Sequence, residues 1–148
     1  MKKRRREGGV DAGKLPITEI VYSEGGYFGA PAGFEIDVRF GIFSCERGVD
    51  MHGPATEPIW PESWYVPDSD RARFLELVEA CDFLAWQDSY EMECCDGTHW
   101  ELKVKSGRRT LRRIHGVNLW PDQWKAVLRL LEFCHSPIDF NNEPEEDE

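Results

Sequence analysis

The sequence predicts a single α+β domain, in which a twisted antiparallel sheet of about five strands carries two amphipathic helices on one face. The 148 residues make one domain of ordinary size. Segments with alternating apolar and polar residues come in two groups, and each group is followed by a segment with helical spacing. The expected order is therefore two strands, a long loop, a helix, three strands and a second helix.

We expect the folded domain to span residues 16–140, between two disordered charged tails. Residues 1–15 include five consecutive positive charges at 2–6, and residues 141–148 carry five negative charges. The basic tail is alternatively a tether for nucleic acid. Because the tail charges cancel, the formal net charge of −10 belongs to the domain itself. Such a surface repels nucleic acid and attracts basic partners.

The sequence also predicts a cytoplasmic location without a membrane anchor. No stretch approaches the roughly 18 consecutive apolar residues that a membrane span needs, and no apolar stretch follows the positive start as it does in a secretion signal. The five cysteines are an odd number at irregular spacings, which fits free thiols better than disulfides.

Two strands are expected before the long loop. Residues 17–23 are rich in β-branched and aromatic side chains, and residues 24–33 carry four glycines that predict a turn. In residues 34–42, apolar side chains alternate with Glu, Asp, Arg and Gly. This period of two predicts one strand with one face on the core and the other in water.

Residues 45–67 are predicted to form a long loop. This segment has four prolines and no clear period, and loops of this length in compact domains are usually functional or mobile. It carries Trp60, Trp64 and Tyr65. These aromatic side chains either cap one end of the core or, if exposed, are anchors for a protein partner.

Two helices are expected, one capped by Asp68 or Ser69 and one entered through Pro121. Each has apolar residues at i, i+3, i+4 and i+7, which predicts one buried stripe. The stripes are Phe74, Leu77, Val78 and Cys81 in the first helix, and Trp124, Val127, Leu128, Leu131 and Cys134 in the second. Ser136 and Pro137 end the second helix.

Residues 89–95, 98–105 and 109–115 are predicted to form a three-stranded meander. A two-residue turn at Asp96 and Gly97 would put the apolar residues of the first two strands on opposite faces, whereas a three-residue bulged loop puts them on one face. The hydrophobic pattern favours the bulged loop. In the third strand, Leu111 and Ile114 disagree about which face is inward.

Three motifs between residues 86 and 124 resemble those of a group of small bacterial proteins. The motifs are Trp-Gln-Asp-Ser-Tyr at 86–90, Asp-Gly-Thr-His-Trp-Glu-Leu at 96–102 and Gly-Val-Asn-Leu-Trp-Pro-Asp-Gln-Trp at 116–124. The related pattern is a D-G-x-x-W-x-L strand followed by G-x-N-x-x-P-x-x-W or F at a helix start. The resemblance implies an α+β fold and no established activity, so no catalytic residue follows from it. Trp120 stands where Tyr is expected.

No common catalytic or cofactor motif is present, and we predict neither an enzyme nor a cofactor. Asp96 and His99 suggest an acid–base pair, but the turn explains Asp96 better. Cys94, Cys95, His99 and His115 suggest a metal site. Adjacent residues of a strand point to opposite faces, however, so both cysteines cannot bind one ion without distortion. We therefore predict no metal site.

Six basic residues cluster around one predicted turn, at Lys103, Lys105, Arg108, Arg109, Arg112 and Arg113. One interpretation is cross-strand pairing with Glu91, Glu93 and Glu101. The other is a site for phosphate or for an acidic partner, with Lys103, Lys105, Arg109 and Arg113 as its residues.

The leading functional hypothesis is a non-enzymatic acidic binding protein, an inhibitor or immunity-type protein of bacteria or phage. Its partner would be a basic nucleic-acid-handling protein such as a nuclease, a toxin or a CRISPR effector, which the acidic surface blocks by mimicking nucleic acid. The candidate partner-binding residues are Trp60, Trp64, Tyr65, Glu35, Asp37, Glu91 and Glu93. The alternative is a small enzyme or ligand-binding protein whose pocket lies between the 45–67 loop and the sheet, lined by Asp96, His99 and His115.

Overall fold

The computed structural model describes residues 15–26, 31–47, 59–92, 97–138 and 140, so nearly all of both predicted tails lies outside it. The described residues form a seven-stranded sheet with the strand order β4-β3-β2-β1-β6-β7-β5. The strands are β1 (Glu19–Gly26), β2 (Ala32–Asp37), β3 (Ile42–Arg47), β4 (Ile59–Tyr65), β5 (Ser89–Glu91), β6 (Thr98–Ser106) and β7 (Arg109–Val117). The helices are α1 (Arg71–Ala80) and α2 (Trp124–Phe133), with short 3-10 turns η2 (Asp68–Asp70) and η3 (Phe83–Ala85).

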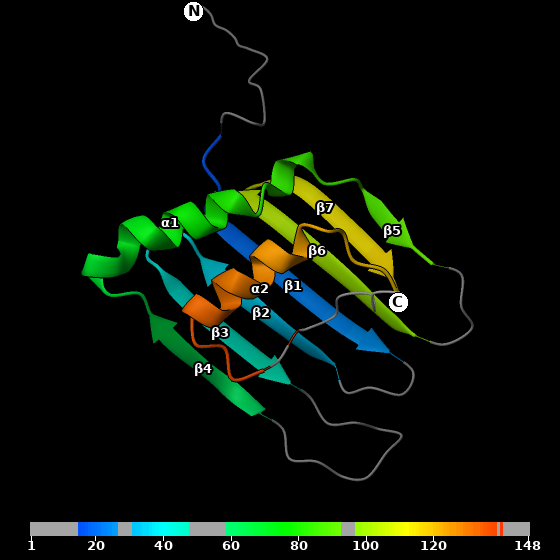
Figure 1. Cartoon of the computed structure of the whole chain (residues 1–148), viewed down its shortest axis with the longest axis horizontal. Helices are drawn as coiled ribbons and strands as arrows, with labels where there is room; N and C mark the ends of the chain where they lie inside the picture. The colour runs from blue at the N-terminus through cyan, green and yellow to red at the C-terminus, as the bar shows by residue number, and fades with distance from the viewer. Residues whose placement is uncertain (1–14, 27–30, 48–58, 93–96, 139, 141–148) are drawn as a thin grey trace, which may run out of the picture.

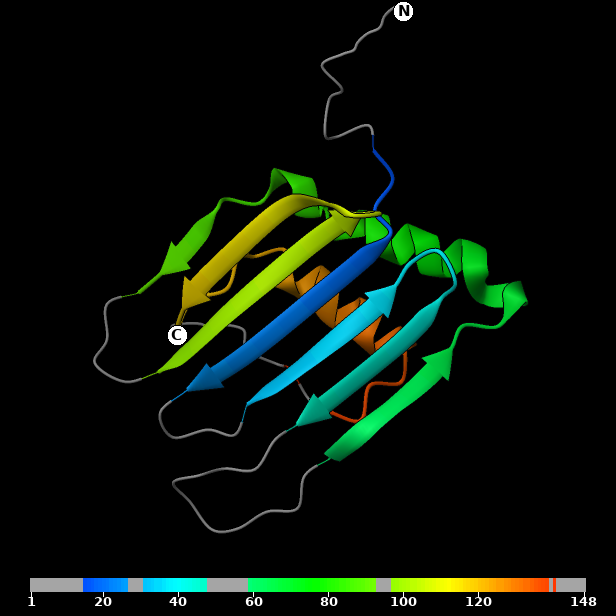
Figure 2. The ribbon, with the colours of Figure 1, turned by 180° about the vertical axis from the view of Figure 1, so that it is seen from behind.

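Both α-helices pack on the same face of the sheet and contact each other (Figure 1). Turned to the other side, the sheet shows a second face that no described helix covers (Figure 2). We call this second face the open face. The predicted α+β architecture, with two helices on one face, is confirmed. At ten residues each, neither described helix has the length of about 20 residues that a bilayer span requires.

The segment 34–42, predicted as one strand, forms parts of two. Strand β2 ends at Asp37 and β3 begins at Ile42. Between them the Phe40 N–H donates to Asp37 Oδ1 at 3.0 Å, and the Gly41 N–H donates to the Asp37 carbonyl at 2.8 Å. Gly41 has a φ of +67°, which favours glycine. Asp37 followed by Gly41 is turn chemistry that the apolar alternation conceals.

Much of the predicted 45–67 loop is also strand. Strand β3 continues to Arg47, and β4 pairs with it antiparallel at the edge of the sheet. Pro61 lies within β4, and edge strands tolerate proline because one side of their backbone is unpaired. Residues 48–58 lie outside the described part. The sheet therefore has seven strands instead of about five.

The predicted meander is wrong in its first pairing. Strand β5 runs parallel to β7 and does not pair with β6, so neither proposed hairpin register exists. Tyr90 nevertheless stacks against Trp100, with ring centroids 6.2 Å apart. A bulge in β7 explains why Leu111 and Ile114 disagree about which face is inward. Val104 pairs with Arg112, whereas the next residue, Lys105, pairs with Thr110. Leu111 is therefore the extra residue, half-buried, while Ile114 is buried.

The helical stripes follow the prediction with two local differences. All four predicted residues of the α1 stripe are buried, but no side chain caps the helix and η2 precedes it. In α2 Leu130 is buried and Leu128 is only partly so. The helix ends with His135 at a φ of +60°, where the Ser136 N–H donates to the Leu131 carbonyl at 3.1 Å.

Tyr22 on β1 is the centre of an aromatic core. Its ring centroid lies 5.1 Å from that of Phe34, 6.0 Å from Trp100, 4.9 Å from Trp124 and 5.8 Å from Phe140. The indole N–H of Trp120 donates to the Tyr22 hydroxyl at 3.1 Å, and that hydroxyl donates to Glu24. The core therefore joins β1 to β2, β6 and α2.

Residues of the motifs at 96–102 and 116–124 pack against each other in the structure. The indole of Trp100 lies over Gly116, where any Cβ would overlap the ring, and its N–H donates to the Leu119 carbonyl at 2.9 Å. Asn118 takes a φ of +59° and accepts the Thr98 N–H at 2.8 Å through Oδ1. A Cβ on Gly97 would overlap this amide. These contacts give the motif residues a structural role.

Replacing Trp100 by alanine should lower the free energy of unfolding by about 3–5 kcal/mol, because a fully packed indole is removed from the core. Urea denaturation followed by far-UV circular dichroism measures this change. A loss below about 1 kcal/mol would show that Trp100 is not in the core.

Gly116→Ala should cost about 1–3 kcal/mol, because the new methyl group overlaps the Trp100 ring. In the Trp100→Ala background the same change should cost much less, since the ring is gone. A double-mutant cycle by urea denaturation measures this coupling. Equal costs in both backgrounds would contradict the proposed contact.

Candidate functional site

The open face carries every second side chain of its strands, and the pairing registers align these side chains in rows across the sheet. One row runs through Val21 on β1, which pairs with Glu35 on β2 and Lys103 on β6. The row continues to Ser44 on β3 and to Arg113 on β7. Acidic side chains therefore lie on one side of β1, and basic ones on the other.

The row of Glu19 repeats this division, whereas the row of Ser23 also carries an acidic residue, Glu101, on the β6 side. Glu19 on β1 pairs with Asp37 and with Lys105. Ser23 pairs with Gly33 and with Glu101, and these in turn pair with Glu46 and His115. We call the β2–β3 side of the open face the acidic half and the β6–β7 side the basic half.

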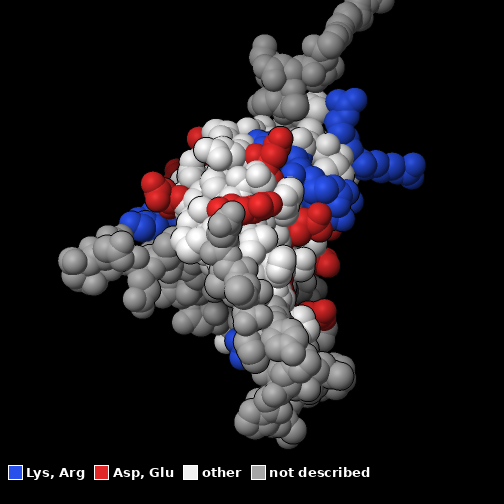
Figure 3. Space-filling model, turned by 90° about the vertical axis from the view of Figure 1, so that its right-hand side faces the viewer, with Lys and Arg blue, Asp and Glu red and all other residues white. Residues whose placement is uncertain are grey.

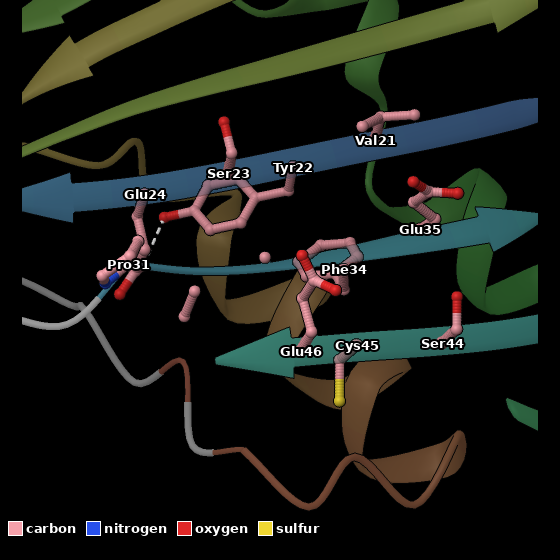
Figure 4. Close-up of a pocket in the computed structure, with 12 residues that line it drawn as sticks. Val21, Tyr22, Ser23, Glu24, Pro31, Phe34, Glu35, Ser44, Cys45 and Glu46 are labelled. Carbon is pink, nitrogen blue, oxygen red and sulfur yellow. Dashed lines mark hydrogen bonds between the residues drawn. The ribbon is translucent and has the colours of Figure 1, made fainter. Parts of the chain in front are cut away.

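The acidic half surrounds a shallow hollow of about 540 Å³. Ser23, Glu35, Ser44 and Glu46 from three neighbouring strands line it (Figure 4). Glu35 and Glu46 are exposed, and neither forms an ion pair with another described residue. Their carboxylates are thus available to a cationic group from outside.

A glycine shapes the floor of this hollow. A Cβ on Gly33 would lie 2.6 Å from the carbonyl oxygen of Tyr22, so the strand geometry at this position requires glycine. Gly33 has no side chain, and Ser23 and Ser44 have only short ones. The surface between Glu35 and Glu46 is therefore recessed.

The basic half is partly neutralised. Arg113 pairs with Glu101 at 3.1 Å, which is one pair of the cross-strand interpretation, and Lys105 pairs with Glu19 at 3.7 Å. Lys103 forms no ion pair with a described residue. Seen from the side of β5 and β7, Lys and Arg side chains gather on the right of the molecule with acidic side chains beside them (Figure 3).

Two of the clustered arginines differ in role. Arg112 projects to the helix side, where it donates to the Leu84 carbonyl at 2.9 Å and to Asp88 Oδ1 at 2.7 Å. It therefore ties β7 to the segment after α1 and is not available to a ligand. Arg109 is exposed at the start of β7, at the end of the hairpin.

The predicted aromatic anchors are separated by the sheet. Trp64 lies on the helix side, with its ring 6.2 Å from that of Phe133 and 4.7 Å from that of His135, so it caps the core. Tyr65 is 64% exposed and pairs with Ile42 at the corner of the sheet nearest the acidic half. The side chain of Trp60 lies outside the described part.

The remaining predicted acidic residues do not join the hollow. Asp37 accepts the Phe40 N–H, which explains it by the β2–β3 turn. Glu91 lies on β5, 3.6 Å from His115 Nε2, and Glu93 is outside the described residues. Glu46 was not among the predicted binding residues because residues 45–67 were expected to form a loop. The alternation of Phe43 and Cys45 with Ser44 and Glu46 was the available signal.

The chemistry of the alternative hypothesis is not assembled in the described residues. His99 and His115 are both exposed on the open face, outside the hollow, while Cys94, Cys95 and Asp96 lie outside the described part. Within that part, no group of three or more His, Cys, Asp or Glu side chains is arranged to hold a metal ion.

Cys81 and Cys134 are buried free thiols, and Cys45 is buried as well. Burial raises the pKa of Cys81 and of Cys134 from 9.0 to about 12, because an apolar surrounding disfavours the thiolate. Both therefore stay protonated at neutral pH and are poor nucleophiles and poor metal ligands. Above pH 9 the unfolded chain loses thiol protons that the folded chain keeps, so this contribution to stability declines as the pH rises toward 12.

No protein-family model matches the chain, and no curated protein matches it in sequence. The function therefore has to be inferred from the geometry of the open face.

Cys81 and Cys134 should remain unmodified by iodoacetamide in the native protein at pH 8, because they are buried and protonated. Peptide mass mapping after brief alkylation measures this. The same protein unfolded in urea is the control, and both residues should react there. Native alkylation as fast as in urea would show that these thiols are accessible.

Proposed function

We propose that the protein is a non-enzymatic binding protein, of inhibitor or immunity type, whose acidic half engages a basic surface of a nucleic-acid-handling protein. The observation that carries the proposal is the pair of exposed carboxylates, Glu35 and Glu46, on either side of a hollow with no described cation to neutralise them. A nuclease, a toxin or a CRISPR effector presents the arginine and lysine side chains that such a surface attracts.

The spacing of the two carboxylates suits a basic side chain. Glu35 pairs with Ser44, and Glu46 pairs with Gly33, so the two glutamates are diagonal neighbours on adjacent strands. Diagonal neighbours lie about 7–8 Å apart, which lets one guanidinium donate to both carboxylates. Ser23 and Ser44 add hydroxyl groups at the centre of the same hollow.

The basic half supports selectivity. A uniformly cationic partner would meet Lys103 and Arg113 as well as the glutamates, and like charges placed together cost several kcal/mol. The partner surface that fits is therefore basic where it covers β2 and β3 and neutral or acidic where it covers β6 and β7. Direct binding of nucleic acid by this net-negative domain is disfavoured.

We further propose that the protein works in the cytoplasm. Cys81 and Cys134 are free thiols buried in the core, which supports a reducing compartment.

Glu35→Gln/Glu46→Gln should weaken partner binding by about tenfold or more, because it removes both unpaired carboxylates and preserves the shape of the hollow. The matched control is Glu76→Gln/Glu79→Gln, which removes two exposed carboxylates from α1. The wild-type protein and the two double variants would be immobilised as baits and incubated with a bacterial lysate at about 50 mM salt. Bound proteins would be eluted with double-stranded DNA, and the affinity of each recovered protein would be measured by calorimetry.

The proposal requires a basic nucleic-acid-binding protein that DNA elutes from the wild-type and control baits and that the double variant fails to retain. Recovery of no such protein, or equal retention by the double variant, would contradict it.

A further inference from the structure

The charges of the open face are arranged symmetrically about β1. In the row of Val21, Glu35 and Lys103 lie one strand away on opposite sides. In the row of Glu19, Asp37 and Lys105 do the same. In the row of Ser23, Glu46 on β3 and His115 on β7 lie two strands away on opposite sides. Glu35, Asp37 and Glu46 thus each have a lysine or histidine counterpart in their own row at the same distance from β1, and Glu101 is the exception because it lies opposite Gly33.

This arrangement makes the face complementary to itself. When two copies meet face to face about a two-fold axis parallel to β1, every row is kept and the two sides are exchanged. Lys103 then faces Glu35 of the second copy, and Lys105 faces Asp37 of the second copy. His115 faces Glu46 of the second copy, and Val21 packs on Val21 at the axis.

The other face-to-face two-fold, with its axis across the strands, does not have this property. It places each strand over its own counterpart, so that, with the axis through the row of Val21, Lys103, Arg113 and Glu35 each face the same residue of the second copy. Repulsion disfavours that dimer. The charge pattern therefore selects one geometry.

The side chains nearest the axis fit this geometry. Lys103 and Glu35 form no ion pair with a described residue of their own chain, so a second copy supplies each with its counter-charge. Glu19 lies on the axis with its own counterpart, but it is already paired with Lys105. Val21 is half-buried and gives the centre of the contact an apolar element.

We propose that two copies of this chain associate through their open faces, about a two-fold axis parallel to β1. Six strand spacings of about 4.8 Å and six residues of about 3.3 Å give the face an area on the order of 600 Å². Side-chain relief brings this near the roughly 800 Å² that each partner buries in a standard interface. The proposal does not depend on the proposed foreign partner, although both use the same surface.

The test is a charge reversal with its rescue, measured by sedimentation equilibrium of the full chain at 150 mM salt, where the net charge of −10 is screened beyond about 8 Å. Lys103→Glu and Glu35→Lys should each weaken the dimer by about tenfold or more, because an isologous interface repeats each like-charge contact twice. Lys103→Glu/Glu35→Lys restores opposite charges across the axis and should return the dissociation constant to within about threefold of the wild type.

Arg73→Glu and Glu76→Lys on α1 are the matched controls, because they change the net charge equally on the helix side and should leave the dimer intact. Glu46→Lys with His115→Glu tests a second row by the same logic, should either residue of the first pair disturb folding as judged by circular dichroism. A wild type that stays monomeric at about 1 mM would overturn the proposal. So would a dimer that is insensitive to the single reversals, or single reversals without rescue.

Discussion

The burial of Tyr22 determines what the opposite side of β1 can present. Its ring is enclosed by Phe34, Trp100, Trp124 and Phe140. A shift of β1 by one residue would move this ring into water and turn Glu19, Val21 and Ser23 toward the core. The aromatic core therefore fixes Val21 on the open face, and the pairing of β1 with β2 and β6 fixes the positions of Glu35 and Lys103 relative to it. The charge pattern is a consequence of core packing.

The order of the strands explains why the two charges separate. Strand β1 lies between β2 and β6, so it joins an N-terminal group, β1 to β4, to the C-terminal pair β6 and β7. The N-terminal group brings Glu35 and Glu46 to the open face, and the C-terminal pair brings Lys103 and Arg113. A sequence-level net charge of −10 conceals this division, because it averages over segments that the fold places side by side.

Local patterns in the sequence were enough to predict the two helices and their buried stripes. The errors have a common cause in non-local pairing. Residues 89–91 alternate like a strand of a meander, yet they pair parallel with β7. Contacts between separate elements, such as the stacking of Tyr90 on Trp100, accompany this pairing and are not visible in the local pattern. Strand β4 was not predicted because its segment contains proline. An edge strand tolerates proline, since one side of its backbone is unpaired. The acidic half was found only in part, because Glu46 belongs to the end of β3, which extends into the predicted 45–67 loop.

The two proposed uses of the open face constrain each other. In the dimer, the acidic half of each copy is covered by the basic half of the other copy. A foreign partner therefore binds only the monomeric fraction, and the apparent affinity for that partner is reduced by this fraction. The positive charge of the basic half thus has two effects. It excludes partners that are cationic throughout, and it holds the glutamates in a contact that a better-matched surface must displace. A strongly acidic face without Lys103 would bind basic proteins with less discrimination, because nothing on it would repel the wrong ones.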